Sequence, residues 1–158
     1  MSHVLLFVAL LALTTVYAVW RGGAPERIGA AILLVGVIAT PIAASASHVR
    51  WQQVEVGVML TDGAALAAFL VLMIWANRLW PIAMTSLLIL QLAGHLLKLL
   101  DPTLYPFLYW VTATVWGYLM LAVLASGTWL HRRRLRSHGY DNAWSKSWHR
   151  TPPSDPGS

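Results

Sequence analysis

Five apolar stretches, each about the length of a membrane-spanning helix, occupy most of this 158-residue chain. They run approximately over residues 4–20, 28–47, 53–75, 80–100 and 105–130. A helix needs about 20 predominantly apolar residues to cross the hydrocarbon core of a bilayer. The composition, 58% hydrophobic and 11% charged, leaves no room for a separate soluble domain. We therefore expect an all-α fold, a polytopic membrane bundle of about five transmembrane helices over residues 1–130, followed by a basic and aromatic tail over 131–158 that is partly disordered.

The positive charges predict how this bundle is oriented. Nine of the eleven Lys and Arg residues fall on one side of a five-span arrangement, and only Arg50 and Lys98 fall on the other. Positive residues concentrate on the cytoplasmic side of membrane proteins, so we expect an N-out/C-in topology. No Lys or Arg precedes the first stretch, whereas Arg21 and Arg27 follow it, which favours a retained anchor over a cleaved signal peptide.

Small residues indicate which spans approach one another most closely. A stripe of small side chains lets two helix backbones come together in lipid, where packing replaces the hydrophobic effect. Two such stripes fall on the second and third stretches, which are therefore expected to form a close pair. They consist of Ala39, Ala43 and Ser47, and of Gly57, Thr61, Ala64 and Ala68.

Ionisable residues inside the apolar stretches are the main indication of a site. Gln91, His95 and Lys98 follow at steps of four and three and share one helix face. The third and fourth stretches should form an antiparallel hairpin, which places Asp62 level with the turn from Gln91 to His95, and Glu55 near Lys98. At about 1.5 Å per residue, Asp62 lies close to the middle of the bilayer. The sequence predicts an intramembrane polar seam that deepens from the outer surface.

Three interpretations of this seam remain open. In the first, the polar groups are mutual partners that lock the hairpin, which the non-titrating Gln91 beside Asp62 favours. In the second, Asp62 and His95 form a proton or small-ligand site. In the third, His3, His48 and His95 contribute to a metal or haem site, although none of them has close ligand spacing. We expect no metal and no cofactor.

Several classes of function are disfavoured by what the sequence contains. Its cysteine count is zero, which removes disulfides, thiolate metal sites and cysteine nucleophiles. Its serines and threonines stand in no recognisable catalytic motif, and we find no Gly-rich phosphate loop. We therefore expect no enzymatic activity. The net charge of +5 arises largely in the tail, so a membrane surface explains it better than nucleic acid does.

The tail is expected to contact the anionic headgroups of the lipid bilayer. A basic cluster directly after a span is suited to phospholipid headgroups. Beyond the cluster, aromatic residues recur every fourth position, which fits either a short interfacial helix or a disordered segment. The residues expected to touch headgroups are Arg132, Arg133, Arg134, Arg136, Trp144 and Trp148.

The central part of the chain resembles a group of small, uncharacterised multi-pass inner-membrane proteins of sphingomonad-type Alphaproteobacteria. The residues that carry the resemblance are Glu55–Asp62, Arg78–Pro81, Gln91–Lys98, Trp116–Tyr118 and Gly127–Thr128. The resemblance implies a multi-pass topology in a bacterial inner membrane and no specific activity.

These observations lead to two functional expectations from different classes. The first is a non-catalytic accessory, assembly or small-ligand-handling component of a membrane system, with a membrane-protein partner or a second copy of the chain. The alternative is a minimal proton-linked transporter or sensor that uses Asp62 and His95.

Overall fold

The chain forms five α-helices within the part that the structure, a computed structural model, describes, namely residues 2–44, 54–101, 103 and 105–145. The helices are α1 (Ser2–Arg21), α2 (Ala24–Ala43), α3 (Val56–Trp75), α4 (Trp80–Leu100) and α5 (Pro106–His138). The first four are each long and apolar enough to cross a membrane. The expected all-α fold is confirmed, and the predicted apolar stretches coincide with these helices to within a few residues at most ends.

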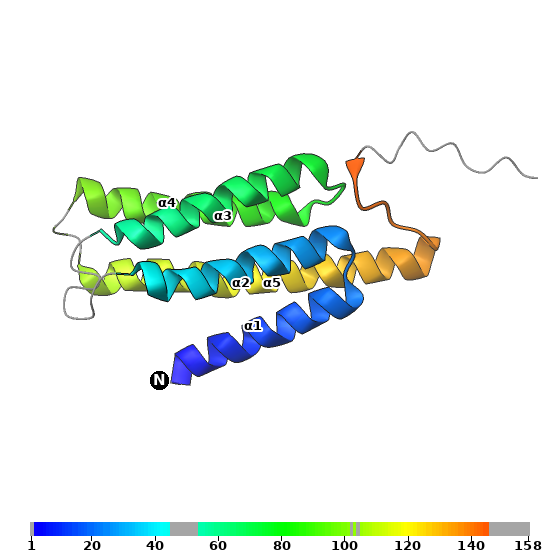
Figure 1. Ribbon diagram of the computed structural model, residues 1–158, viewed down its shortest axis with the longest axis horizontal. Helices are drawn as coiled ribbons and strands as arrows, with labels where there is room; N and C mark the ends of the chain where they lie inside the picture. Colours follow the sequence, from blue (N-terminus) through cyan, green and yellow to red (C-terminus); the bar gives the residue numbers. More distant parts are fainter. Residues whose placement is uncertain (1, 45–53, 102, 104, 146–158) are drawn as a thin grey trace, which may run out of the picture.

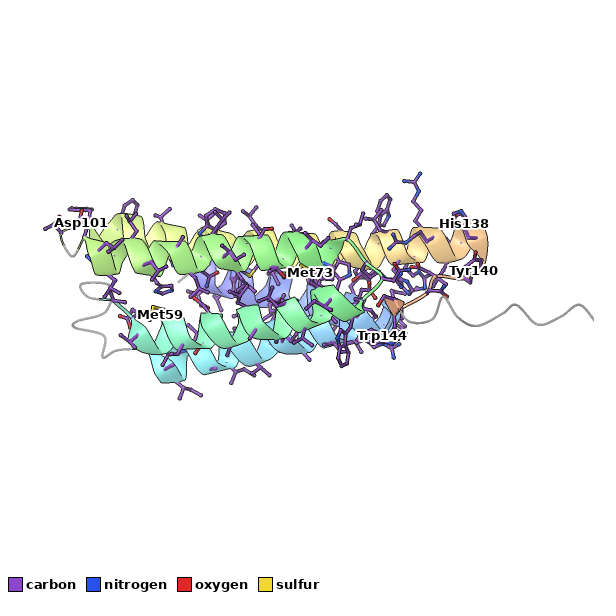
Figure 2. All side chains as sticks on the ribbon, turned by 90° about the horizontal axis from the view of Figure 1, so that it is seen from above. Met59, Met73, Asp101, His138, Tyr140 and Trp144 are labelled. Carbon is purple, nitrogen blue, oxygen red and sulfur yellow. The ribbon has the colours of Figure 1, made fainter. Side chains whose placement is uncertain are left out.

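The helices pack as a closed ring. Each helix contacts the next one along the chain, and α5 returns to contact α1. In Figure 1, α3 and α4 lie side by side, α2 and α5 lie together beneath them, and α1 flanks this second pair. Figure 2 shows Asp101 at one end of the ring and His138 at the other. We call these the Asp101 end and the Arg78 end, the second after the residue in the α3–α4 turn.

The expected close pairing of α2 and α3 is present near the Asp101 end. A methyl group added at Gly57 would overlap the carbonyl group of Ala43 and would lie in tight contact with its Cβ. The two backbones therefore approach at a point where only glycine fits. Thr61, one turn further along the predicted stripe, turns its hydroxyl back to the Gly57 carbonyl at 3.0 Å, which satisfies this polar group within α3.

Compared with a water-soluble protein, the locations of many apolar and charged side chains are reversed between surface and interior. Large aliphatic side chains face outwards on every described helix, with Leu5, Ile42 and Leu100 exposed by 68%, 80% and 83%. Several charged and titratable side chains are instead buried, and those in the described residues are Glu26, Glu55, Asp62, Arg78, His95, Lys98 and His131. Exposed apolar surface of this extent is typical of a protein whose surroundings are lipid. The arrangement is that of a multi-pass membrane protein.

The last helix continues beyond the predicted end of its span. α5 runs through the basic cluster and stops at Gly139, whose φ of +74° gives the left-handed cap that glycine adopts without strain. The chain from 140 to 145 then folds back to the α3–α4 turn, so an interfacial α-helix, one of the two alternatives for this segment, is not formed over these residues. The backbone N–H of Asn77 donates to the Ala143 carbonyl at 3.1 Å, and Trp144 pairs with Ala76 in an isolated bridge.

Candidate functional site

The polar seam predicted between α3 and α4 is present at Asp62. The side-chain amide of Gln91 donates to Asp62 Oδ2 at 2.7 Å, and His95 Nε2 lies 3.1 Å from the same oxygen. Gln91 and His95 share a face because they are four residues apart on one helix. Asp62 and His95 are both buried. The predicted contact between Asp62 and this turn of α4 is therefore confirmed.

Only one oxygen of the Asp62 carboxylate is occupied by these contacts. Both neighbours approach Oδ2, and no other described residue makes a hydrogen bond to Oδ1. A buried carboxylate is usually satisfied by several donors, since an unmet acceptor costs free energy. Asp62 therefore retains capacity to accept a further hydrogen bond.

The outer part of the seam, Glu55 and Lys98, is buried within the protein, although its predicted shallow position suggested contact with headgroups or water. Glu55 is 1% exposed and Lys98 is 2% exposed, and both lie near the Asp101 end of the ring. Their predicted mutual pairing stays a prediction. Beside them, hydrogen bonds from the Thr103 hydroxyl and backbone N–H hold the pKa of Asp101 below its usual value, and the charge of Lys98 acts in the same direction.

A cavity of about 290 Å³ adjoins the seam inside the ring. All five helices contribute to its wall, which is predominantly apolar, with Phe7 from α1, Gly36 from α2 and Met120 from α5. Asp62 and Gln91 line it as well. The volume is near the lower end of the range of small-molecule sites, which are mostly apolar with a few placed polar groups. Asp62 and Gln91 are thus part of a cavity wall as well as of a contact between two helices.

A second polar cluster, at the Arg78 end, is the site that sequence reasoning missed. Arg78 Nε lies 3.3 Å from Glu26 Oε1, and Arg78 Nη1 lies 2.5 Å from Asp141 Oδ1. The Arg78 and Glu26 side chains are almost completely buried. Trp80 Nε1 also donates to Glu26 Oε1 at 2.9 Å, and the backbone N–H of Gly23 donates to Glu26 Oε2 at 3.0 Å. We call this set of contacts the Arg78 cluster.

The remaining residues of the Arg78 cluster come from α5 and from the segment 140–145 that follows it. His131 Nδ1 lies 2.7 Å from Asp141 Oδ2 and 3.1 Å from Arg78 Nη2. A guanidinium only donates hydrogen bonds, so Nδ1 either donates to Asp141 or accepts from Arg78, but does not do both at once. The Asn142 carbonyl accepts from Arg78 Nη1 at 2.9 Å. The cluster therefore joins α2, the α3–α4 turn, α5 and the segment after α5.

The residues predicted to touch lipid headgroups divide into three groups. Arg132, Arg133 and Arg136 form no ion pair with any residue that the structure describes. Arg134 instead donates to Asp141 Oδ2 at 3.3 Å, and Trp144 is partly buried against the apolar core. Trp148 lies outside the described residues. The contact of these residues with headgroups remains a prediction.

The structure describes two of the three histidines considered as metal or haem ligands. His3 packs edge-on against Trp110, with ring centroids 5.8 Å apart, and His95 contacts Asp62. His48 lies outside the described residues. Among the described residues, no three His, Cys, Asp or Glu side chains are grouped so that they could hold a metal ion.

No protein-family model, curated protein or solved structure matches this chain.

Proposed function

We propose that this chain is a multi-pass protein of a bacterial inner membrane that binds a small, largely apolar ligand in the cavity beside Asp62. In this proposal the five helices all span the bilayer, with the N-terminus outside and the C-terminus inside. The protein has no catalytic activity of its own and handles its ligand as an accessory component of a larger membrane system, with a membrane-protein partner or a second copy.

One observation carries the ligand-binding proposal. Asp62 lines the cavity while Gln91 and His95 both bond to its Oδ2, which leaves Oδ1 able to accept a hydrogen bond from a bound molecule. The two α4 side chains hold the carboxylate in place, as supporting hydrogen bonds do in preorganised sites. The apolar wall then favours a small molecule with an apolar body and one hydroxyl or amine donor.

A cavity-filling variant tests this proposal without altering the polar groups. Gly36 lines the cavity, and an added Cβ there meets no atom within 4 Å. We expect Gly36→Leu to occupy the ligand volume and to abolish complementation of a deletion phenotype, with normal protein abundance. Gly63→Leu is the matched control, because a Cβ at Gly63 also has open space but Gly63 does not line the cavity. Normal complementation by Gly36→Leu would refute ligand binding at this place.

The alternative function is a proton-linked transporter or sensor, which the 3.1 Å contact between His95 Nε2 and Asp62 Oδ2 favours. A relay requires groups that change charge, whereas a lock needs only a neutral hydrogen-bonded pair. The Asp62→Asn and His95→Gln double variant distinguishes a proton relay from a structural lock. A relay predicts normal abundance with complete loss of complementation, and a purely structural lock predicts that complementation persists in this variant and in Gly36→Leu.

A further inference from the structure

A groove lined by arginines lies at the Arg78 end, between the last turn of α1 and the last turns of α5. Its volume is about 640 Å³, and its walls carry Tyr17, Arg21, Trp129, Arg132, Arg133 and Arg136. Trp129, Arg132, Arg133 and Arg136 follow at helical spacing, so they share one face of α5. Tyr17 and Arg21 are one turn apart on α1. We call this surface the basic groove.

The positive charge of the basic groove is not balanced by the part of the protein that the structure describes. None of its four arginines forms an ion pair with a described carboxylate, although Arg133 lies over the ring of Trp129 at 5.5 Å. Arg78 and Arg134 contrast with them, because both are paired with acids. Glu26 and Asp141 are engaged within that cluster. The groove is therefore a positively charged surface whose arginines are available to an anion from outside the described chain.

The position of the groove along the helices indicates the source of an anion that could bind there. α5 has 33 residues, so it is about 50 Å long at ~1.5 Å per residue, against a hydrocarbon core of about 30 Å. The C-terminal end of α5 projects past the end of α1, as Figure 1 shows. With the membrane interface placed at the C-terminal end of α1, Trp129 and Tyr17 would lie near it, where aromatic side chains concentrate. Next to the groove, Val16 and Trp20 expose 59% and 77% of their surface, as residues facing acyl chains do.

We propose that the basic groove binds the phosphate headgroup of an anionic phospholipid, with its acyl chains against the adjoining outer surface of α1 and α5. Arginine binds phosphate with two parallel hydrogen bonds, and four guanidiniums with no acid among the lining residues favour a lipid with net negative charge over a zwitterionic one. The site differs from the headgroup contacts expected from sequence. It adds Tyr17 and Arg21 from α1, and it leaves out Arg134 and Trp144, which have partners within the protein.

The test is native mass spectrometry of the full-length protein in a neutral detergent with equal amounts of phosphatidylglycerol and phosphatidylcholine of the same acyl chains. We expect a retained phosphatidylglycerol adduct. Losing one charge-assisted contact should weaken its binding about tenfold, so Arg132→Gln should reduce the adduct strongly and Arg132→Lys less. Arg27→Gln is the matched control, because Arg27 is an exposed arginine near the same end that does not line the groove.

Three results would overturn the proposal. The first is equal retention of the two lipids by the wild-type protein, which needs no variant to interpret. The second is a loss in Arg27→Gln as large as that in Arg132→Gln, which would indicate general charge attraction. The third is complete displacement of phosphatidylglycerol by millimolar inorganic phosphate, which would indicate a site for free anions. Because different residues line the cavity beside Asp62, none of these results affects the function proposed there.

Discussion

Arg78 is buried because two acidic side chains distant in the chain neutralise it. Glu26 and Asp141 lie 52 and 63 residues away, yet both reach its guanidinium. A buried charge of this kind persists only when it is paired and hydrogen-bonded. Removing one partner of a buried ion pair lowers the stability of the protein by more than the intact pair adds to it. The reason is that the remaining charge stays buried without compensation.

The first prediction follows from that cost. Arg78→Met should lower the free energy of unfolding by about 3–5 kcal/mol, because Glu26 would remain buried without its cation and Asp141 would keep only His131 and Arg134. The measurement is thermal unfolding of the purified variant in detergent. Arg27→Gln serves as the control, with an expected change within about 0.5 kcal/mol for an exposed residue. Equal Tm values for the two variants would show that Arg78 does not stabilise this end.

The second prediction at this scale concerns the Asp62 carboxylate. Asp62→Ala leaves Gln91 and His95 without their shared acceptor, and an unmet buried polar group costs about 1–3 kcal/mol. Asp62→Asn keeps a side-chain oxygen that can accept from one of them, so its loss should be smaller. Thermal unfolding in detergent compares the two variants. If Ala and Asn are equally stable, the hydrogen bonds to Asp62 do not contribute to stability.

At the scale of helices, Trp80 connects α4 to α2, α3 and α5. It does so by side-chain packing as well as by its hydrogen bond to Glu26. Its ring packs edge-on against Phe69 of α3, with centroids 6.2 Å apart. A Cβ added at Gly29 of α2 or at Gly127 of α5 would lie 2.5 or 2.6 Å from the Trp80 ring. The ring therefore fills a space that two glycines leave open.

This close packing gives the third prediction. Gly127→Ala should destabilise the bundle by about 1–3 kcal/mol, because the added methyl group forces Trp80 or the helices apart. Gly63→Ala makes the same substitution where nothing lies within 4 Å, and it should be neutral or slightly stabilising. Unfolding of both variants in detergent is the measurement. A tolerated Gly127→Ala would mean that the ring moves freely at this contact.

For the whole molecule, the proposed orientation makes the fourth prediction. Because nine of the eleven Lys and Arg residues lie on one side of the five-span arrangement, a reporter fused after Ser158 should be cytoplasmic and one inserted at Gln53 should be periplasmic. Reporters active in only one compartment measure this directly. A periplasmic C-terminus would exclude the proposed orientation, and together with a periplasmic Gln53 it would also exclude three spans after residue 53.

The sequence alone was sufficient to predict the helices and the contact at Asp62. Helix length follows from the length of each apolar stretch, since a bilayer of fixed thickness requires about 20 apolar residues. The short Asn77–Leu79 turn makes α3 and α4 antiparallel neighbours. Residues at equal distance from a short turn then lie at equal depth, which is why Asp62 could be matched with Gln91 and His95.

Only the tertiary structure determined the Arg78 cluster, the cavity and the basic groove. In the sequence, Arg78 is one of nine positive charges on the predicted cytoplasmic side, where Glu26 and Asp141 are possible partners that no spacing connects to it. Asp141 reaches it because α5 stops at Gly139 and the chain returns to the α3–α4 turn, which no helical period indicates. The cavity requires all five helices, and the groove requires the closure of α5 onto α1. Periodicity encodes contacts within a helix or across a short turn, whereas these sites depend on how the ring of helices closes.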